Sequence, residues 1–172
     1  MGDQYLGNML LKRADVQHNF TKEEVEEYIK CRDDIVYFLE NHVKIVHVDK
    51  GLIPFDLYPF QEKLIRHLES SRFSIIKSAR QSGKSVTSLG YLLHYILFNQ
   101  SKIVGILANK AATARELLNR IQVAYQYLPK FLQQGIMEWN KGSLELENGS
   151  KILASSTSSS AIRGFSFSAV LL

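Results

Sequence analysis

The sequence predicts an α/β fold in which a mainly parallel sheet is flanked by helices, and two observations support it. Apolar, β-branched runs of strand length alternate with segments of helical periodicity, which is the succession expected for strands joined by right-handed crossovers. In addition, a loop of small residues separates one apolar run from a helix-like segment. The chain has 172 residues, of which 45% are hydrophobic, so it is long enough for one domain with its own core.

Residues 1–50 are expected to form an N-terminal helical extension to a main domain at 51–172. Thr21 and Glu24 have the spacing of a capping box, so a helix is expected to begin there. Four further elements are expected in sequence order: a continued or restarted helix at 35–39, a short strand at 43–48, a loop marked by Gly51 and Pro54, and a helix from Pro59 to about Leu68.

The main domain contains the segments expected to build the sheet. Strands are expected at 73–77, at 102–108 and from 168 onward, and helices at 86–98 and 111–127. Asn148-Gly149 is the strongest short signal for a hairpin, and it separates two expected strands at 143–147 and 151–155. The sequence therefore predicts a β-hairpin inserted into an otherwise parallel arrangement.

The loop between the 73–77 run and the following helix has the composition of a phosphate-binding loop. Gly83, Lys84 and Ser85 match the end of the pattern G-x-x-x-x-G-K-[ST], although Ser78 stands where the first glycine usually is. The glycine lets the backbone approach a phosphate, the lysine contacts the β- and γ-phosphates, and the serine hydroxyl binds Mg²⁺. The following helix N-terminus favours an anion. We therefore expect a nucleoside triphosphate and Mg²⁺ to be bound by Ser78, Ala79, Arg80, Gln81, Ser82, Gly83, Lys84 and Ser85.

Charge is distributed unevenly along the chain. Residues 1–70 contain nine Lys and Arg against thirteen Asp and Glu, whereas residues 71–172 contain twelve against four. A basic second half fits a polyanionic partner, such as nucleotide phosphates and DNA. No aspartate follows Asp56, so few carboxylates are offered for catalysis in the region of the loop.

The cysteine and histidine content argues against other classes of protein. Cys31 is the only cysteine, which excludes an internal disulfide framework, and the five histidines are scattered and interpreted as structural or surface residues. No apolar run has the length of a membrane span, and residues 1–13 lack a signal-peptide pattern. We therefore expect neither membrane insertion nor secretion.

Several segments of 50–172 together resemble the large terminase subunit of tailed bacteriophages, in particular the T-even-like group. They are the Arg80-Gln81 pair before the loop glycine, GILANK at 105–110, LPKFLQQGIMEWNKGSLELENGS at 128–150, and AIRGFSF at 161–167. The resemblance implies a P-loop NTPase domain whose ATP hydrolysis drives double-stranded DNA into a procapsid. It further implies the portal protein and the small terminase subunit as partners, a homo-oligomeric ring at the portal, and a location in the host cytoplasm.

The same resemblance implies roles for individual residues. Arg80 is expected to act in cis on the γ-phosphate as a catalytic residue beside Lys84. Gln61 matches a glutamine that hydrogen-bonds adenine, since an amide can donate and accept at once. Lys110 is a candidate for coupling nucleotide state to DNA, and Arg163 is expected near the nucleotide or a neighbouring subunit, with its role left open.

One departure from the family concerns the strand expected from Ser168. In the family it runs into an acidic pair that holds Mg²⁺ and activates water, whereas this sequence stops at Leu172. We therefore expect an N-terminal fragment without the Walker B acids or the nuclease domain, which binds ATP weakly and hydrolyses it negligibly alone. Two other interpretations stay open: a helicase-like ATPase acting on nucleic acid, and a non-catalytic nucleotide-binding or assembly module.

Overall fold

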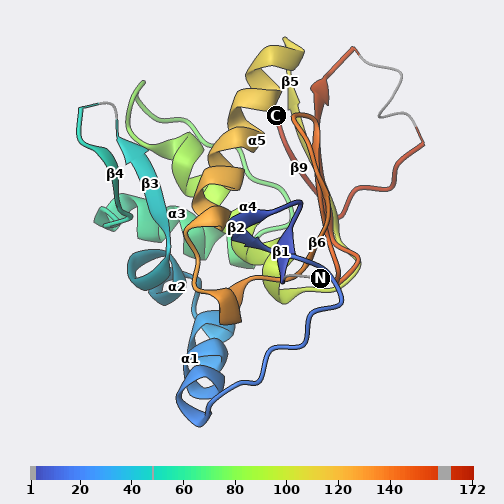
Figure 1. Ribbon diagram of the computed structural model, residues 1–172. Coiled ribbons are helices and arrows are strands. Elements are labelled where there is room, and N and C mark those ends of the chain that lie inside the picture. The colour runs from blue at the N-terminus through green and yellow to red at the C-terminus, as the bar shows by residue number, and fades with distance from the viewer. Residues whose placement is uncertain (1–2, 48, 159–163) are drawn as a thin grey trace.

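The centre of the molecule is a five-stranded sheet. Figure 1 shows the computed structural model, which describes residues 3–47, 49–158 and 164–172. The strand order is β6-β7-β8-β5-β9. The strands are β5 (Ile103–Ala108), β6 (Ile136–Trp139), β7 (Ser143–Leu146), β8 (Lys151–Ser156) and β9 (Ala169–Leu171). Strand β5 pairs in parallel with both β8 and β9, whereas β6, β7 and β8 pair antiparallel.

The sheet is therefore mixed, and the expectation of a mainly parallel sheet is corrected. The Asn148-Gly149 turn reverses the chain between β7 and β8, so β7 can pair with β8 only in the antiparallel sense. Gly149 has a φ of 78°, which such a tight turn requires. The predicted hairpin is thus confirmed, and it adds β6 and β7 to one edge of the parallel strands.

Within the described residues, five α-helices and one short 3₁₀ helix accompany the sheet. They are α1 (Lys22–Asp33), α2 (Ile35–His42), α3 (Pro59–Ser70), α4 (Lys84–Phe98), α5 (Ala111–Gln126) and η1 (Lys130–Leu132). The capping box at the start of α1 is confirmed, because the Thr21 hydroxyl accepts from the Glu24 N–H and the Glu24 carboxylate accepts from the Thr21 N–H. Asp34 then breaks the helix and caps α2 through the N–H groups of Val36 and Tyr37.

The hydrophobic core lies between the sheet and the helices. Helix α5 packs on β5 and β8, and α4 packs against α5, α3 and α2 (Figure 1). Val104, Ile106 and Ile152 alternate along their strands toward this core, where they join the buried leucines of α4. On the opposite face, the ring of Phe167 lies against Gly105, at a distance where a Cβ on Gly105 would be crowded.

The strand predicted at 73–77 is wrong, because this segment runs without regular secondary structure. The side chains of Phe73 and Ile75 are 84% and 100% exposed. A strand needs a hydrogen-bonding neighbour, and in the described part of the chain none lies beside 73–77. A cleft of about 630 Å³, lined by residues of this segment and by β9, separates it from the sheet edge.

Two small hairpins complete the fold. Strand β3 (Lys44–His47) pairs antiparallel with β4 (Gly51–Pro54), so the loop expected at 51–54 is instead a strand held by its partner. Strands β1 (Gln4–Tyr5) and β2 (Asn8–Lys12) form a hairpin that the sequence analysis did not predict. The Gln133 amide binds β2, because its Oε1 accepts from the Lys12 N–H and its Nε2 donates to the Leu10 carbonyl.

The hairpin turn at Asn148 is also tied to the end of α4. The Asn148 Nδ2 donates to the carbonyls of Ile96, Leu97 and Asn99 at 2.8, 3.4 and 3.2 Å. These are carbonyl groups that a helix leaves unpaired at its C-terminus. Asn148 therefore fixes α4 to the β7–β8 turn, at the end of the helix opposite to the predicted phosphate loop.

Candidate functional site

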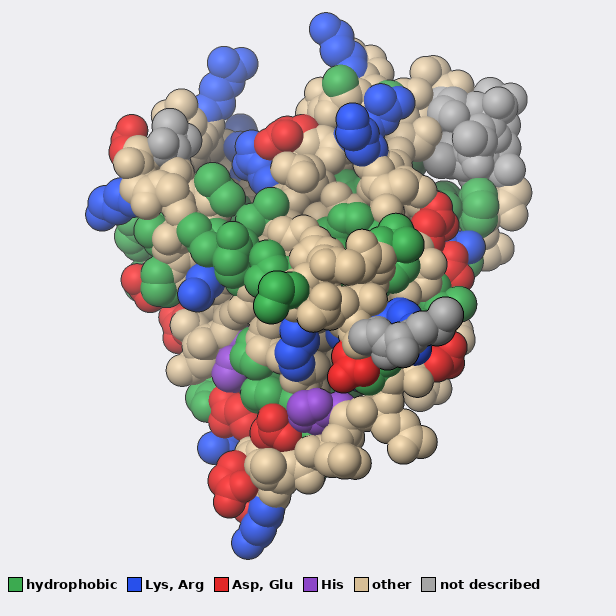
Figure 2. All heavy atoms as spheres, viewed as in Figure 1, with side chains coloured by type: hydrophobic (Ala, Val, Ile, Leu, Met, Phe, Trp, Pro, Cys, Tyr) green, Lys and Arg blue, Asp and Glu red, His purple; other side chains and the backbone are tan. Residues whose placement is uncertain are grey.

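A cleft of about 1150 Å³ lies between the β3–β4 hairpin, the N-terminus of α3, the start of α4 and one face of α5. Figure 2 shows the surface hollowed between the hairpin and α5, with Lys and Arg side chains projecting at the upper rim. The polar side chains lining the cleft include His47, Lys50, Asp56, Gln61, Glu116 and Arg120. The predicted phosphate loop contributes Gln81 to Ser85, so the site contains the core of the sequence motif.

The N-terminus of α4 faces this cleft without a capping side chain. Its N-cap is Gly83, which has a left-handed φ of 79°, and no acidic residue lies in the first turn. The first intrahelical bond runs from the Thr87 N–H to the Gly83 carbonyl at 3.0 Å. The preceding N–H groups, from Lys84 to Val86, therefore have no partner within the helix. Free N–H groups and the helix dipole favour an anion here.

The loop before α4 is held by contacts among its own residues. The Ala79 carbonyl accepts from the Lys84 Nζ at 3.2 Å and from the Ser82 hydroxyl at 2.9 Å, and the hydroxyls of Ser78 and Ser82 lie 3.0 Å apart. Ser78 does not have a positive φ, whereas Gln81 does, with a φ of 61°. The serine in place of the usual first glycine is therefore compatible with this loop, because its position needs no left-handed backbone.

Gln61 lies at the floor of the cleft, next to the loop. Its side chain is 3% exposed, and its Oε1 accepts from the Tyr58 N–H at 2.9 Å. Tyr58 and Phe60 also line the cleft, where their exposed rings stack with centroids 5.8 Å apart. The structure thus brings Gln61 together with the phosphate loop, while its contact to adenine stays a prediction.

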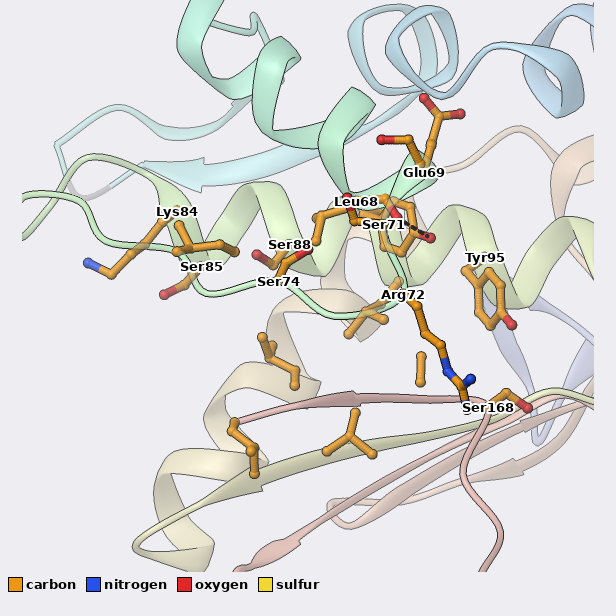
Figure 3. Close-up of a pocket in the computed structure, with 18 of the residues that line it drawn as sticks. Leu68, Glu69, Ser71, Arg72, Ser74, Lys84, Ser85, Ser88, Tyr95 and Ser168 are labelled. Atoms are coloured by element: carbon orange, nitrogen blue, oxygen red, sulfur yellow. Dashed lines mark hydrogen bonds between the residues drawn. The ribbon is translucent and has the colours of Figure 1, made fainter.

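Lys84 and Ser85 lie at the junction of two clefts. They also line the cleft of about 630 Å³ on the other side of α4, together with Ser88 and residues of β9. Figure 3 shows Lys84 and Ser85 at one end of this second cleft, while Arg72 points toward Ser168 at the other end. A ligand bound at the start of α4 can therefore lie next to residues of both clefts.

The other predicted residues lie outside the larger cleft. Arg80 is exposed and does not line it, and Lys110 is the exposed N-cap of α5. Arg163 falls outside the residues that the structure describes. The sequence analysis missed Lys50, Glu116 and Arg120, which line the cleft from elements far from the motif. No sequence signal marks them, because only the packing of α5 and the hairpin brings them to the loop.

One group of side chains has the arrangement of a metal site. The ligand atoms of Glu27, Cys31 and His42 all lie within 4.8 Å of one another at the contact of α1 with α2. The Glu27 Oε1 already accepts from the His42 Nε2 at 2.7 Å and from the Tyr37 hydroxyl at 2.8 Å. Burial raises the pKa of the Cys31 thiol to about 12, so the thiol keeps its proton at neutral pH. These contacts satisfy the group as a packing network.

Across the helices that the structure describes, none combines the length and the apolar character needed to cross a bilayer.

Comparisons with known proteins identify similar proteins over the part of the chain that contains the loop. A family model described as "terminase large subunit, T4likevirus-type, N-terminal" matches residues 75–172. The crystal structure of the HK97 bacteriophage large terminase matches with a TM-score of 0.63 and 21% identity, which shows similarity of fold. That match covers 79% of this chain and 29% of the HK97 chain.

Proposed function

This chain belongs to the T4-like terminase large subunit family, and from that membership we propose that its larger cleft binds MgATP as part of a phage DNA-packaging motor. In this proposal residues 51–172 form part of a P-loop NTPase domain. The complete protein would use ATP hydrolysis to move double-stranded DNA into a procapsid, together with the portal protein and the small subunit.

The observation that carries the proposal is the open N-terminus of α4 at the floor of the 1150 Å³ cleft. The N–H groups of the first turn lie beside the side chains of Lys84 and Ser85, and both of these residues line the cleft. These groups fit a triphosphate and its Mg²⁺, because they supply backbone donors, one positive charge and one hydroxyl ligand. The apolar walls from the hairpin, α3 and α4 leave room for a nucleoside beside them.

Each loop residue has a distinct part in this binding. Lys84 would exchange the Ala79 carbonyl for phosphate oxygens, which are stronger acceptors because they carry charge. Ser85 would direct its hydroxyl to Mg²⁺. Arg80, which is exposed in this structure, would move toward the γ-phosphate to stabilise the charge of the transition state.

ATP hydrolysis requires a carboxylate that activates the attacking water, and residues 71–172 contain only four acidic residues. Among the six acidic residues after Asp56, Glu116 lines the larger cleft, and its Oε1 accepts from the Arg120 Nε at 3.4 Å. The Glu116 carboxylate is already engaged by the Arg120 guanidinium, so it is not free to orient an attacking water. We therefore propose that this chain alone binds ATP and hydrolyses it slowly.

The test is calorimetric titration of the purified chain with MgATP. The Lys84→Ala variant should bind about tenfold to a hundredfold more weakly, since it loses a hydrogen bond between charged groups. Lys141→Ala is the matched control, because Lys141 is exposed in the β6–β7 turn and lines neither cleft described above. Equal affinities of wild type and Lys84→Ala, with both proteins folded, would contradict the proposed site. Fast turnover abolished by Lys84→Ala would instead contradict the slow hydrolysis.

A further inference from the structure

His47 is the last residue of β3, and its ring contacts the turn that leads to β4. The His47 Nδ1 accepts from the Asp49 N–H at 3.1 Å and from the Lys50 N–H at 3.3 Å. We propose that His47 is a pH-dependent switch in the wall of the larger cleft: its neutral imidazole holds this turn closed, and protonation of the ring opens it. The inference concerns the wall of the cleft and does not depend on which ligand the cleft binds.

The first observation is that the ring takes the place of a backbone acceptor. The ladder between β3 and β4 ends at the pair His47–Gly51, so Asp49 and Lys50 lie beyond it. Within the described residues, neither of their N–H groups has a carbonyl partner. The conformation of this turn therefore depends on one ring nitrogen with a free lone pair.

The second observation comes from the β6–β7 turn of the same chain, which has the same pattern with a different acceptor. There the Asn140 Oδ1 accepts from the Gly142 and Ser143 N–H groups at 2.7 and 2.8 Å, again two and three residues further along. An amide oxygen accepts at every pH, whereas an imidazole nitrogen accepts only while it carries no proton. The turn at His47 is therefore titratable where the turn at Asn140 is not.

The third observation is that the base of the hairpin is fixed independently of His47. The Phe55 N–H donates to the Val43 carbonyl at 3.0 Å, and both side chains are buried in the core. Opening of the turn would thus be confined to the tip of the hairpin. His47 and Lys50 both line the larger cleft, so a change at the tip alters the wall of that cleft.

The sign of the pH dependence follows from the charged groups of the cleft. Those that line it together with His47 are Asp49 and Lys50 on the hairpin, Asp56 before α3, Lys84 on α4, and Glu116 and Arg120 on α5. Imidazole is the group type among them that ordinarily changes its charge between pH 5 and pH 8. In the imidazolium both ring nitrogens carry a proton, so Nδ1 would face two N–H groups as a third donor. The closed turn is therefore complete at pH 7.5 and is lost as the pH falls.

The first experiment uses trypsin, which cleaves after lysine, and measures cleavage at Lys50 relative to cleavage at Lys141 in the same digest. Lys141 is exposed in the Asn140 turn, so the ratio cancels the pH dependence of the protease itself. The ratio for the wild type should rise about fivefold between pH 7.5 and pH 5.5, because the tip loses the hydrogen bonds that close it.

Two variants separate the switch from a general effect of acid. His47→Asn should keep a low ratio at both pH values, since asparagine can accept from the same N–H groups as Asn140 does. His47→Ala should show the raised ratio at both pH values. A wild-type ratio that stays constant, an equal rise in His47→Asn, or a His47→Ala ratio equal to wild type at pH 7.5 would each overturn the inference.

The second experiment is NMR titration of the wild type with ¹⁵N-labelled histidine. At pH 8 the His47 ring should carry its proton on Nε2, and the amide signals of Asp49 and Lys50 should move with the same midpoint as the ring. The amide signals of Gly142 and Ser143 are the control and should not move. A proton on Nδ1 at pH 8, or Asp49 and Lys50 signals that do not follow the ring, would contradict the switch. Neither experiment uses a nucleotide, so its failure is distinguishable from failure of the proposed function.

Discussion

Replacement of His94 tests how the packing of α4 against α1 and α2 responds to pH. His94 is 6% exposed, and its Nε2 donates to the Cys31 carbonyl at 2.8 Å. The rings of Phe38 and Phe98 lie beside it, with centroids 5.5 and 4.7 Å away. Burial lowers the pKa of His94 from 6.5 to about 4, because the imidazolium would lose its hydration among these rings. The folded protein therefore holds His94 in its neutral form.

The sign of the pH dependence follows from these two pKa values. Between pH 6.5 and pH 4 the unfolded chain binds a proton at His94 that the folded protein does not bind. The stability that comes from neutral His94 is therefore complete above pH 6.5 and is lost as the pH falls toward 4. Linkage gives a loss of about 2 kcal/mol between pH 7.5 and pH 5, and of about 3 kcal/mol by pH 4.

The assay is urea unfolding at pH 7.5 and pH 5 for wild type and for His94→Gln. Glutamine keeps a donor for the Cys31 carbonyl but does not titrate, so the wild type should lose about 2 kcal/mol more than this variant between the two pH values. His67→Gln on the exposed side of α3 is the control and should behave as wild type. If wild type and His94→Gln lose the same free energy, the reasoning from burial is refuted.

Two further predictions concern buried hydrogen bonds and use urea unfolding at pH 7.5. Asn148→Ala should lower the free energy of unfolding by about 1–2 kcal/mol, because it removes the side-chain donor to the Ile96 carbonyl and the acceptor for the Ser150 N–H. Exposed Asn19→Ala should stay within about 0.5 kcal/mol. Tyr125→Phe should also cost about 1–2 kcal/mol, since the Tyr125 hydroxyl donates to the Gln134 carbonyl from a buried position, and Tyr127→Phe on the surface is its control. If Asn148→Ala or Tyr125→Phe changes the free energy of unfolding no more than its own control does, the stabilising role given to that hydrogen bond is contradicted.

Local signals in the sequence located several elements correctly. The Thr21 capping box, the Asn148-Gly149 hairpin and the helix after the phosphate loop are all present, because each depends on neighbouring residues alone. The glycine, lysine and serine of the loop were identified for the same reason, and the larger cleft forms at that loop. The family resemblance seen in residues 50–172 agrees with the family model that matches 75–172.

Contacts between distant residues decided the rest. The apolar run at 73–77 has the composition of a strand, yet it forms none, because strand structure requires a partner that composition cannot supply. Residues 51–54 have the composition of a loop and become a strand because β3 lies beside them. The sequence by itself determined the helix that begins at Lys84, while phosphate binding by the loop before it stays a prediction. Only the tertiary structure placed the Gln61 amide against Gly83, since α3 and α4 meet through packing that no local pattern encodes.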